Sequence, residues 1–292
     1  MSISNRLLKS LGQFASGRII RFIGIFLLAF FLVFFIIPLG YFLILSFFTF
    51  IQTGLYTAAF TFANYQRLVS DIYYLRILSA TFQLGIITSV ACFVLGYPIA
   101  YMLGRSQSRW RNLVLALVVA SMFTNLVVRT FGWVVLLSPH GLLNNILMGM
   151  GLIKEPLQLI FNMTGVVIGE AQIQLPVFIL LVAGVIQMID SNLEHAAKVM
   201  GADDIQAFFA VIWPLNIRGV IGGLSLVFAL TVSSYVTPHF LSGGKVIFAA
   251  LFINTLVTKT LNYPMAGALS AVLIFTSLTV VGGMAWMSRR FI

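Results

Sequence analysis

The chain has 292 residues, of which 60% are hydrophobic and only 8% are charged. A water-soluble domain carries roughly 25% charged residues, so this composition cannot cover a soluble surface and indicates a membrane protein. Seventeen Lys and Arg residues against seven Asp and Glu residues give a formal net charge of +10. In a membrane protein such an excess first indicates how the chain is oriented across the bilayer. We therefore expect no nucleic-acid partner. The single cysteine, Cys92, excludes a disulfide framework.

Six apolar runs are each long enough to cross a lipid bilayer, which takes about 20 residues of helix. We place them at residues 22–48, 77–103, 112–137, 161–189, 219–240 and 263–287. The runs are continuously apolar rather than alternating between apolar and polar residues, which favours helices over a β-barrel. The predicted fold is all-α, with six transmembrane helices in a single transmembrane domain over residues 1–292.

The distribution of basic residues predicts the orientation of these helices. With six crossings, both termini lie on one side; eleven of the seventeen basic residues fall in the loops of that side, five in the opposite loops, and Arg129 inside a span. By the positive-inside rule both termini are cytoplasmic, as are the N-terminal segment 1–21 and the long loop 190–218. The first apolar run is too long for a signal-peptide core, so we expect it to be retained as an anchor.

Several catalytic and nucleotide-binding motifs are missing. The sequence has no Gly-x-x-x-x-Gly-Lys-Ser/Thr phosphate loop, so we do not expect this chain to bind ATP by that motif. His140, His195 and His239 fall in three different loops without the spacing of zinc ligands, and no metal site is predicted. The remaining classes are a transporter or channel subunit, a membrane-embedded enzyme, or a structural membrane component.

The loop 190–218 carries the clearest signal, because it reads as two short helices separated by a glycine. Ser191 or Asn192 can cap the first helix, and Gly201 supplies its end. The second helix can start at residue 203 or 204 and should end before Pro214. Small alanines at the centre allow another surface to approach closely. Apolar side chains suited to a partner's groove are Leu193, Val199, Met200, Phe208 and Phe209.

This loop resembles the cytoplasmic signature of the permease subunits of bacterial binding-protein-dependent ABC importers, which reads Glu-Ala-Ala, three residues, Gly, nine residues, Ile-x-Leu-Pro. Aligned on the glycine, the spacing to the proline is kept, but His195 stands where glutamate is usual and Trp213 replaces leucine. The resemblance implies that the loop couples the chain to ATPase subunits. The implied coupling residues are Glu194, His195, Ala196, Ala197, Gly201, Ala202 and Pro214.

Further segments in the same order resemble the polyamine and opine branch of these permeases. They are residues 64–68, 96–100, 125–133, 234–238 and 262–264. The resemblance implies a multi-pass protein of the bacterial inner membrane with the type I importer fold. It also implies a second six-helix permease as partner in a heterodimer, two cytoplasmic ABC ATPases that hold ATP and Mg, and a periplasmic solute-binding protein. The chain itself would carry no cofactor, and its solute would be a polyamine, an opine or a related amino-acid-like compound.

Two charged residues, Arg129 and Glu170, lie in predicted spans, each roughly 12 to 14 Å from the outer end at 1.5 Å per residue. An unpaired charge at the bilayer centre costs about 2.5 to 3.5 kcal/mol, which suggests a function. Spacings of four place polar groups on one helix face in each span. We predict that the translocation pathway is lined by Asn125, Arg129, Trp133, Glu170, Gln174 and Tyr235.

In this hypothesis Glu170 accepts a cationic group of the solute, Trp133 makes a cation–π contact, and Tyr235 belongs to an outer gate. The alternatives are that Arg129 and Glu170 neutralise each other, that Arg129 snorkels outward, and that Tyr235 is an ordinary interfacial tyrosine. A membrane-embedded enzyme or a channel subunit using Arg129 and Glu170 is the rival function. It leaves the helix-glycine-helix loop unexplained.

Overall fold

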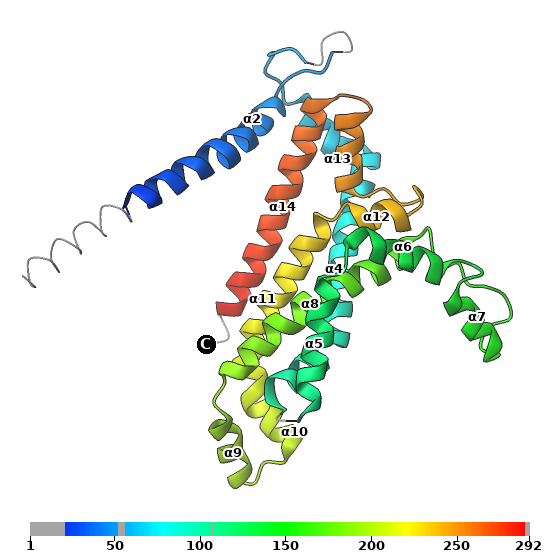
Figure 1. Ribbon diagram of the computed structural model, residues 1–292. Coiled ribbons are helices and arrows are strands. Elements are labelled where there is room, and N and C mark those ends of the chain that lie inside the picture. Colours follow the sequence, from blue (N-terminus) through cyan, green and yellow to red (C-terminus); the bar gives the residue numbers. More distant parts are fainter. Residues whose placement is uncertain (1–20, 52–55, 107, 290–292) are drawn as a thin grey trace, which may run out of the picture.

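The computed structural model describes residues 21–51, 56–106 and 108–289. Their regular secondary structure is helical, apart from a single isolated β-bridge between Thr49 and Thr57. The predicted N-terminal segment 1–21 lies outside the described residues except for Arg21. The elements are η1 (Leu32–Ile36), α2 (Ile37–Leu45), α3 (Ala63–Ser70), α4 (Ile72–Arg105), α5 (Trp110–Met122), α6 (Leu126–Leu137), α7 (Leu142–Gly149), α8 (Met163–Met188), α9 (Ser191–Val199), α10 (Asp204–Ala207), η2 (Phe208–Ile212), α11 (Trp213–Val232), α12 (Val236–Leu241), α13 (Ala249–Thr258) and α14 (Tyr263–Arg289) (Figure 1).

Six segments are long and apolar enough to cross a membrane, which confirms the predicted all-α, six-span fold. They are Arg21–Leu45, Ile72–Arg105, Leu126–Gly149, Met163–Met188, Asp204–Val232 and Tyr263–Arg289. Four of them agree with the predicted spans to within a few residues. The third and the fifth do not, because each predicted run contains a break.

The break in the third run begins where α5 ends at Met122. The side chain of Asn125 accepts hydrogen bonds from the backbone N–H groups of Val127 and Val128, at 2.9 and 3.3 Å, and so starts α6 as its N-cap. An asparagine that bonds the backbone in this way favours a new helix over continuation of the old one. The continuous span predicted over 112–137 is therefore wrong. From this break α6 and α7 turn away from the bundle (Figure 1).

The predicted fifth span, 219–240, is also two helices. Helix α11 ends at Val232, and α12 begins at Val236 after a short non-helical stretch. The Ser233 hydroxyl donates to the carbonyl of Ala229 at 3.0 Å, so it competes for the carbonyl groups of the last turn. The break places Ser234 and Tyr235 at a joint between the two helices. The sequence pattern did not predict helices α3 and α13, which lie in the connecting segments, or α7, which forms the second part of the third span.

The centre of the bundle is formed by α4, α8 and α11, which pack together around the buried ring of Phe178. Glycines on both neighbours make room for this ring. A Cβ atom on Gly96 would lie 2.8 Å from it, and one on Gly223 would lie 3.0 Å from it. Without a hydrophobic driving force between helices in lipid, such small residues let backbones approach closely enough for van der Waals packing.

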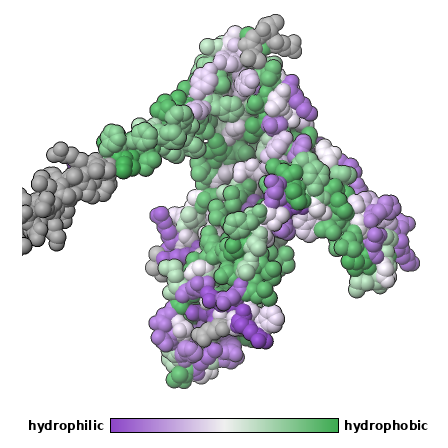
Figure 2. Space-filling view, viewed as in Figure 1, coloured by the Kyte–Doolittle hydropathy of each residue, from purple (hydrophilic) through white to green (hydrophobic). Residues whose placement is uncertain are grey.

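The sides and ends of the bundle differ in polarity. Apolar side chains cover much of its flanks, whereas hydrophilic residues gather at the end that carries α9 and α10 (Figure 2). The loops predicted to be cytoplasmic lie toward that end, and α3 and α13 lie toward the opposite end (Figure 1). This segregation is the arrangement that six crossings require. Which end faces the cytoplasm stays a prediction from the basic residues.

Candidate coupling site and transport pathway

Helix α9 starts at a cap that lies next to the predicted one. The side chain of Asp190, rather than that of Ser191 or Asn192, accepts the hydrogen bond from the Asn192 N–H at 2.9 Å. Asp190 has an extended backbone, with φ −60° and ψ 124°, as an N-cap residue should. Its negative charge also favours the positive end of the helix dipole.

The end of α9 lies at the glycine, as predicted. Gly201 has φ +96°, a left-handed conformation that a side chain would strain. Its N–H donates to the Lys198 carbonyl at 3.0 Å, and the Ala202 N–H donates to the Ala197 carbonyl at 3.1 Å. These two bonds form a Schellman motif, which closes the helix and turns the chain sharply.

Helix α10 begins as predicted but does not end before Pro214. Asp203 and Gln206 form a capping box, with bonds of 2.7 Å from the Gln206 N–H and 3.1 Å from the Asp203 N–H. The helix then continues through the π-helical turn η2 into α11, with Pro214 in its first turn. Proline has no N–H to donate to the preceding turn, and the wider π-helical turn directly before it lets the helix continue despite this lost bond. The α10 helix is therefore continuous with a membrane span.

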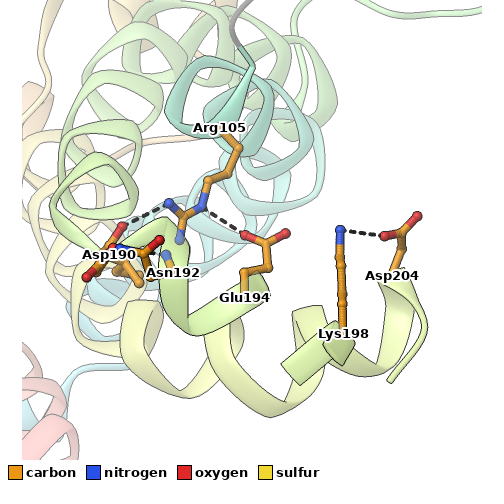
Figure 3. Close-up of polar contacts among 7 residues, drawn as sticks. Arg105, Asp190, Asn192, Glu194, Lys198 and Asp204 are labelled. Atoms are coloured by element: carbon orange, nitrogen blue, oxygen red, sulfur yellow. Dashed lines mark hydrogen bonds and ion pairs between the residues drawn. The ribbon is translucent and has the colours of Figure 1, made fainter. Parts of the chain in front are cut away.

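Arg105, at the end of α4, connects α9 to the bundle through two polar contacts (Figure 3). Its Nη1 donates to the carbonyl of Ile189 at 2.8 Å, and its Nε lies 3.3 Å from Oε2 of Glu194. The second contact is an ion pair outside hydrogen-bond geometry, and both side chains are largely shielded, at 15% and 17% exposure. Arg105 thus contacts the end of α8 and the first turns of α9 at once.

A second ion pair joins α9 to α10, between Lys198 Nζ and Asp204 Oδ1 at 2.7 Å (Figure 3). The hydrogen bond that Lys198 donates to the Asp204 carboxylate raises the pKa of Lys198 above its ordinary value. This pair is open to solvent, where an ion pair contributes little to stability. Of the two ion pairs, the shielded one of Arg105 therefore holds α9 against the end of α4.

Within the altered signature, the ion pair is made by the residue next to the usual glutamate position. His195, at that position, is exposed, and its neighbour Glu194 contacts Arg105. Sequence reasoning missed Arg105, although a basic residue at the end of a preceding span on the same side of the membrane was a usable signal. Ala197 is buried, whereas Ala196 is exposed.

An exposed apolar surface, which we call the α9 patch, consists of Leu193, Val199 and Met200 with exposed fractions of 48%, 88% and 83%. Leu193, Ala196 and Met200 share one helix face at spacings of three and four. Phe209 on the neighbouring turn is exposed as well, at 61%. Phe208, predicted to belong to this surface, instead packs inward against Tyr101 and Trp213.

Helix α6 contacts α8 through a residue that the sequence reasoning missed. Arg129 Nη2 donates to the Gln172 carbonyl at 3.1 Å, and Trp133 Nε1 donates to the Gln172 side-chain oxygen at 3.3 Å. Arg129 and Trp133 therefore share a helix face as predicted, while Asn125 caps the helix. Gln172 was missed because it lies two residues from Glu170, on another face of α8.

Glu170 is fully buried at the joint between α11 and α12. Its carboxylate accepts hydrogen bonds from the Ser234 hydroxyl and, at 3.4 Å, from Gln174, which is also buried. Neither of the ion pairs that the described residues form includes Glu170 or Arg129. The predicted stripe of Glu170 and Gln174 exists, but in this conformation it faces the α11–α12 joint.

Tyr235 lies at the start of α12 and borders an open pocket of about 390 Å³. Its hydroxyl donates to Asn254 Oδ1 at 3.4 Å, and its ring stacks on His239 with 5.3 Å between centroids. The pocket lies between the start of α4, α12 and α13. Its walls are formed by Tyr73, Tyr235, His239, Ser242, Gly244, Ile247, Leu251, Phe252, Asn254, Thr255 and Lys259.

The family of binding-protein-dependent transport system inner membrane components matches residues 96–290. The chain belongs to this family. Over 240 residues it is 32% identical to the spermidine/putrescine transport system permease protein PotB of Haemophilus influenzae, covering 82% of this chain and 84% of the relative. It is 30% identical over 237 residues to PotB of Escherichia coli K12, covering 80% and 84%.

Solved structures agree on the fold. A bacterial ABC transporter that imports the acidic polysaccharide alginate contains a chain with a TM-score of 0.73 and 18% identity, covering 98% of this chain and 99% of that one. A complex of a bacterial alginate ABC transporter with a pentasaccharide-bound periplasmic protein gives 0.74 at 17% identity, covering 96% of each chain. The predicted family, importer permease fold and multi-pass inner-membrane location are confirmed. The family consists of transport-system components rather than enzymes.

Proposed function

We propose that this permease pairs with a second, different six-helix permease, and that the pair forms an alternating-access pathway for a small solute. A periplasmic solute-binding protein delivers the solute, and two cytoplasmic ABC ATPases, which hold ATP and Mg, power its import. This chain has no cofactor in the proposal. The observation that supports it most directly is the structure of the helix pair α9–α10. Arg105 of α4 contacts α9, and α10 is continuous with the α11 span.

The helix pair α9–α10 is suited to transmit movement because it joins an exposed apolar patch to a membrane helix. The ATPases would contact the α9 patch, where Leu193 and Met200 project. Displacement of α9 passes through the Schellman turn at Gly201 into α10, and then along α11 to its break before Tyr235. An ATP-bound state that favours one arrangement of these helices by a few kcal/mol shifts the population between inward- and outward-open forms.

The predicted pathway residues divide into two groups by accessibility. Arg129, Trp133 and Tyr235 retain exposed surface in this conformation, and we propose that they contact the solute. Glu170 and Gln174 are buried, so in the proposal they line the pathway only after α12 separates from α8. Asn125 positions α6 as its cap and contributes to the pathway through that helix.

The solute in this proposal is a polyamine, an opine or a related amino-acid-like compound. The spermidine/putrescine permeases among the relatives support a compound with amino groups. The rival function, a membrane-embedded enzyme or a channel subunit that uses Arg129 and Glu170, finds less support. Arg129 bonds to Gln172 and Glu170 bonds to Ser234, so the two groups do not act on a common point.

Copurification tests the proposal. The tagged chain, extracted in mild detergent from its native host, should bring a second permease and ATPase subunits with it, and loaded binding protein should stimulate ATP hydrolysis. Met200→Asp in the α9 patch should remove the ATPases while the second permease stays. Met150→Asp is the matched control, because Met150 is 68% exposed and lies in the loop predicted to be extracellular. A solitary chain under conditions that preserve other membrane complexes would refute the proposal.

A further inference from the structure

The pocket beside Tyr235 has an unusual charge for a protein whose relatives are named for polyamine transport. Two basic side chains, Lys259 and His239, line it, and no Asp or Glu is among its lining residues. The nearest acid in sequence to a lining residue is Asp71, two residues before Tyr73. Its carboxylate accepts the Tyr73 N–H at 2.9 Å as the cap of α4. A purely cationic solute would therefore find no carboxylate partner on these walls.

The polar groups in the pocket can donate to an anion. The Tyr235 hydroxyl uses the Asn254 side-chain oxygen as acceptor, which leaves the amide N–H₂ of Asn254 as a donor. Lys259 caps the end of α13 with its backbone N–H, and its ammonium forms no ion pair among the described residues. A charge-assisted bond from such an ammonium to a carboxylate is roughly twice as strong as one between neutral groups.

The other wall of the pocket suits an apolar segment. Tyr73 and Phe252 meet edge to face, with 5.5 Å between ring centroids, and Ile247 and Leu251 continue the surface. A pocket of about 390 Å³ lies within the roughly 300 to 1,000 Å³ range of small-molecule sites. Its position next to the α11–α12 joint places a bound solute where the proposed pathway opens.

We propose that this pocket binds the carboxylate of the transported solute, with Lys259 and Asn254 as donors and the Tyr73–Phe252 wall against its carbon chain. The inference rests on the proposed import function and narrows it. The solute is an amino acid or opine-like compound that carries a carboxylate, and not a simple polyamine.

Ornithine and putrescine provide a matched pair of probes, because ornithine is putrescine with an added carboxylate. The complete complex, purified without its binding protein, would carry Thr255→Cys as a reporter on the pocket wall. Mass spectrometry of this chain after treatment with a thiol reagent measures labelling there. The native Cys92 is fully buried and should stay unlabelled.

We expect ornithine to protect residue 255 at a concentration at least tenfold lower than putrescine does. Lys259→Gln should abolish this difference, whereas Lys245→Gln, a nearby basic residue outside the pocket lining, should preserve it. Equal protection by both probes, or a difference that survives Lys259→Gln, would overturn the inference. Protection by unloaded binding protein but not by ornithine would also overturn it, and would assign the pocket to an acidic side chain of that protein. A complex that copurifies normally in any of these cases leaves the importer function standing.

Discussion

At the scale of single residues, Glu170 shows how a buried charge can serve a joint rather than a binding site. Its carboxylate lies where α12 departs from α11, and it receives hydrogen bonds from α8 and from the joint itself. A partnerless buried donor costs about 1 to 3 kcal/mol, so the joint depends on an acceptor at this position. The charge is less important than the acceptor, because no cationic side chain pairs with it among the described residues.

The first prediction separates these two properties of Glu170. Glu170→Ala leaves the Ser234 hydroxyl and the Gln174 amide without their partner, and should destabilise the protein by about 1 to 3 kcal/mol. Glu170→Gln keeps an acceptor for Ser234 and should cost much less. Thermal denaturation of the purified complex, followed by tryptophan fluorescence, gives the comparison. Equal losses in the two variants would show that the negative charge itself is needed.

Gly201 provides a second prediction, because its left-handed backbone ends α9. Gly201→Ala places a Cβ atom on a residue at φ +96° and should cost on the order of 1 to 2 kcal/mol. The strain falls on the turn between α9 and α10, so stimulation of the ATPase should fall with it. Gly184→Ala, near the end of α8 with open space around the new methyl group, is the control and should not reduce stability or ATPase stimulation. Unchanged ATPase stimulation in Gly201→Ala would argue against a rigid turn.

At the scale of elements, the sequence predicted where helices exist better than where they break. The helix-glycine-helix loop was predictable because cap and stop residues are polar and local. The breaks before Asn125 and after Val232 were not predicted, because the apolar runs continue across them. Their signals were an asparagine and a pair of serines, which compete for backbone groups. The continuation past Pro214 was missed because a proline usually ends a helix, and the π-helical turn η2 that accommodates it leaves no signal in the apolar pattern.

The Arg105 contact leads to a prediction about the coupling element. Arg105→Ala removes both the bond to the Ile189 carbonyl and the ion pair, whereas Glu194→Ala removes only the pair. We therefore expect Arg105→Ala to abolish the stimulation of ATP hydrolysis by loaded binding protein, and Glu194→Ala to reduce it several-fold. The double variant should resemble Arg105→Ala, since the residues share one interaction.

Lys198→Ala is the control for this series, because it breaks the exposed ion pair to Asp204 and leaves Arg105 in place. It should leave the stimulation of ATP hydrolysis nearly unchanged, because an exposed ion pair contributes little. The raised pKa of Lys198 means that its contribution is present below the ordinary lysine pKa and is lost only at alkaline pH. The stimulation of ATP hydrolysis should therefore show no pH dependence near neutral pH that arises from the titration of Lys198. A loss of stimulation in Lys198→Ala equal to that in Arg105→Ala would contradict the assigned role of Arg105.

At the scale of the whole molecule, the first membrane helix, Arg21–Leu45, exposes an apolar surface that the rest of the described chain does not cover. None of the residues in its most apolar stretch is buried, and the helix projects from the bundle (Figure 1). Side chains such as Phe22, Ile25 and Phe34 are 68% to 72% exposed and need lipid or another subunit to cover them. The sequence could predict that this segment is a membrane helix, but not that it leaves its own bundle, because apolar composition is the same for both outcomes.

The orientation of the bundle is the last prediction. Eleven basic residues in the loops with the termini against five in the opposite loops place both termini in the cytoplasm. Green fluorescent protein fused after Ile292 should be fluorescent, whereas alkaline phosphatase at the same place should be inactive, since it folds only outside the cytoplasm. Phosphatase inserted at Gly244, where an added Cβ atom would meet no heavy atom within 4 Å, should be active. The reverse pattern would show the opposite orientation in the membrane, with the α9 patch outside the cytoplasm, where the ATPases could not contact it.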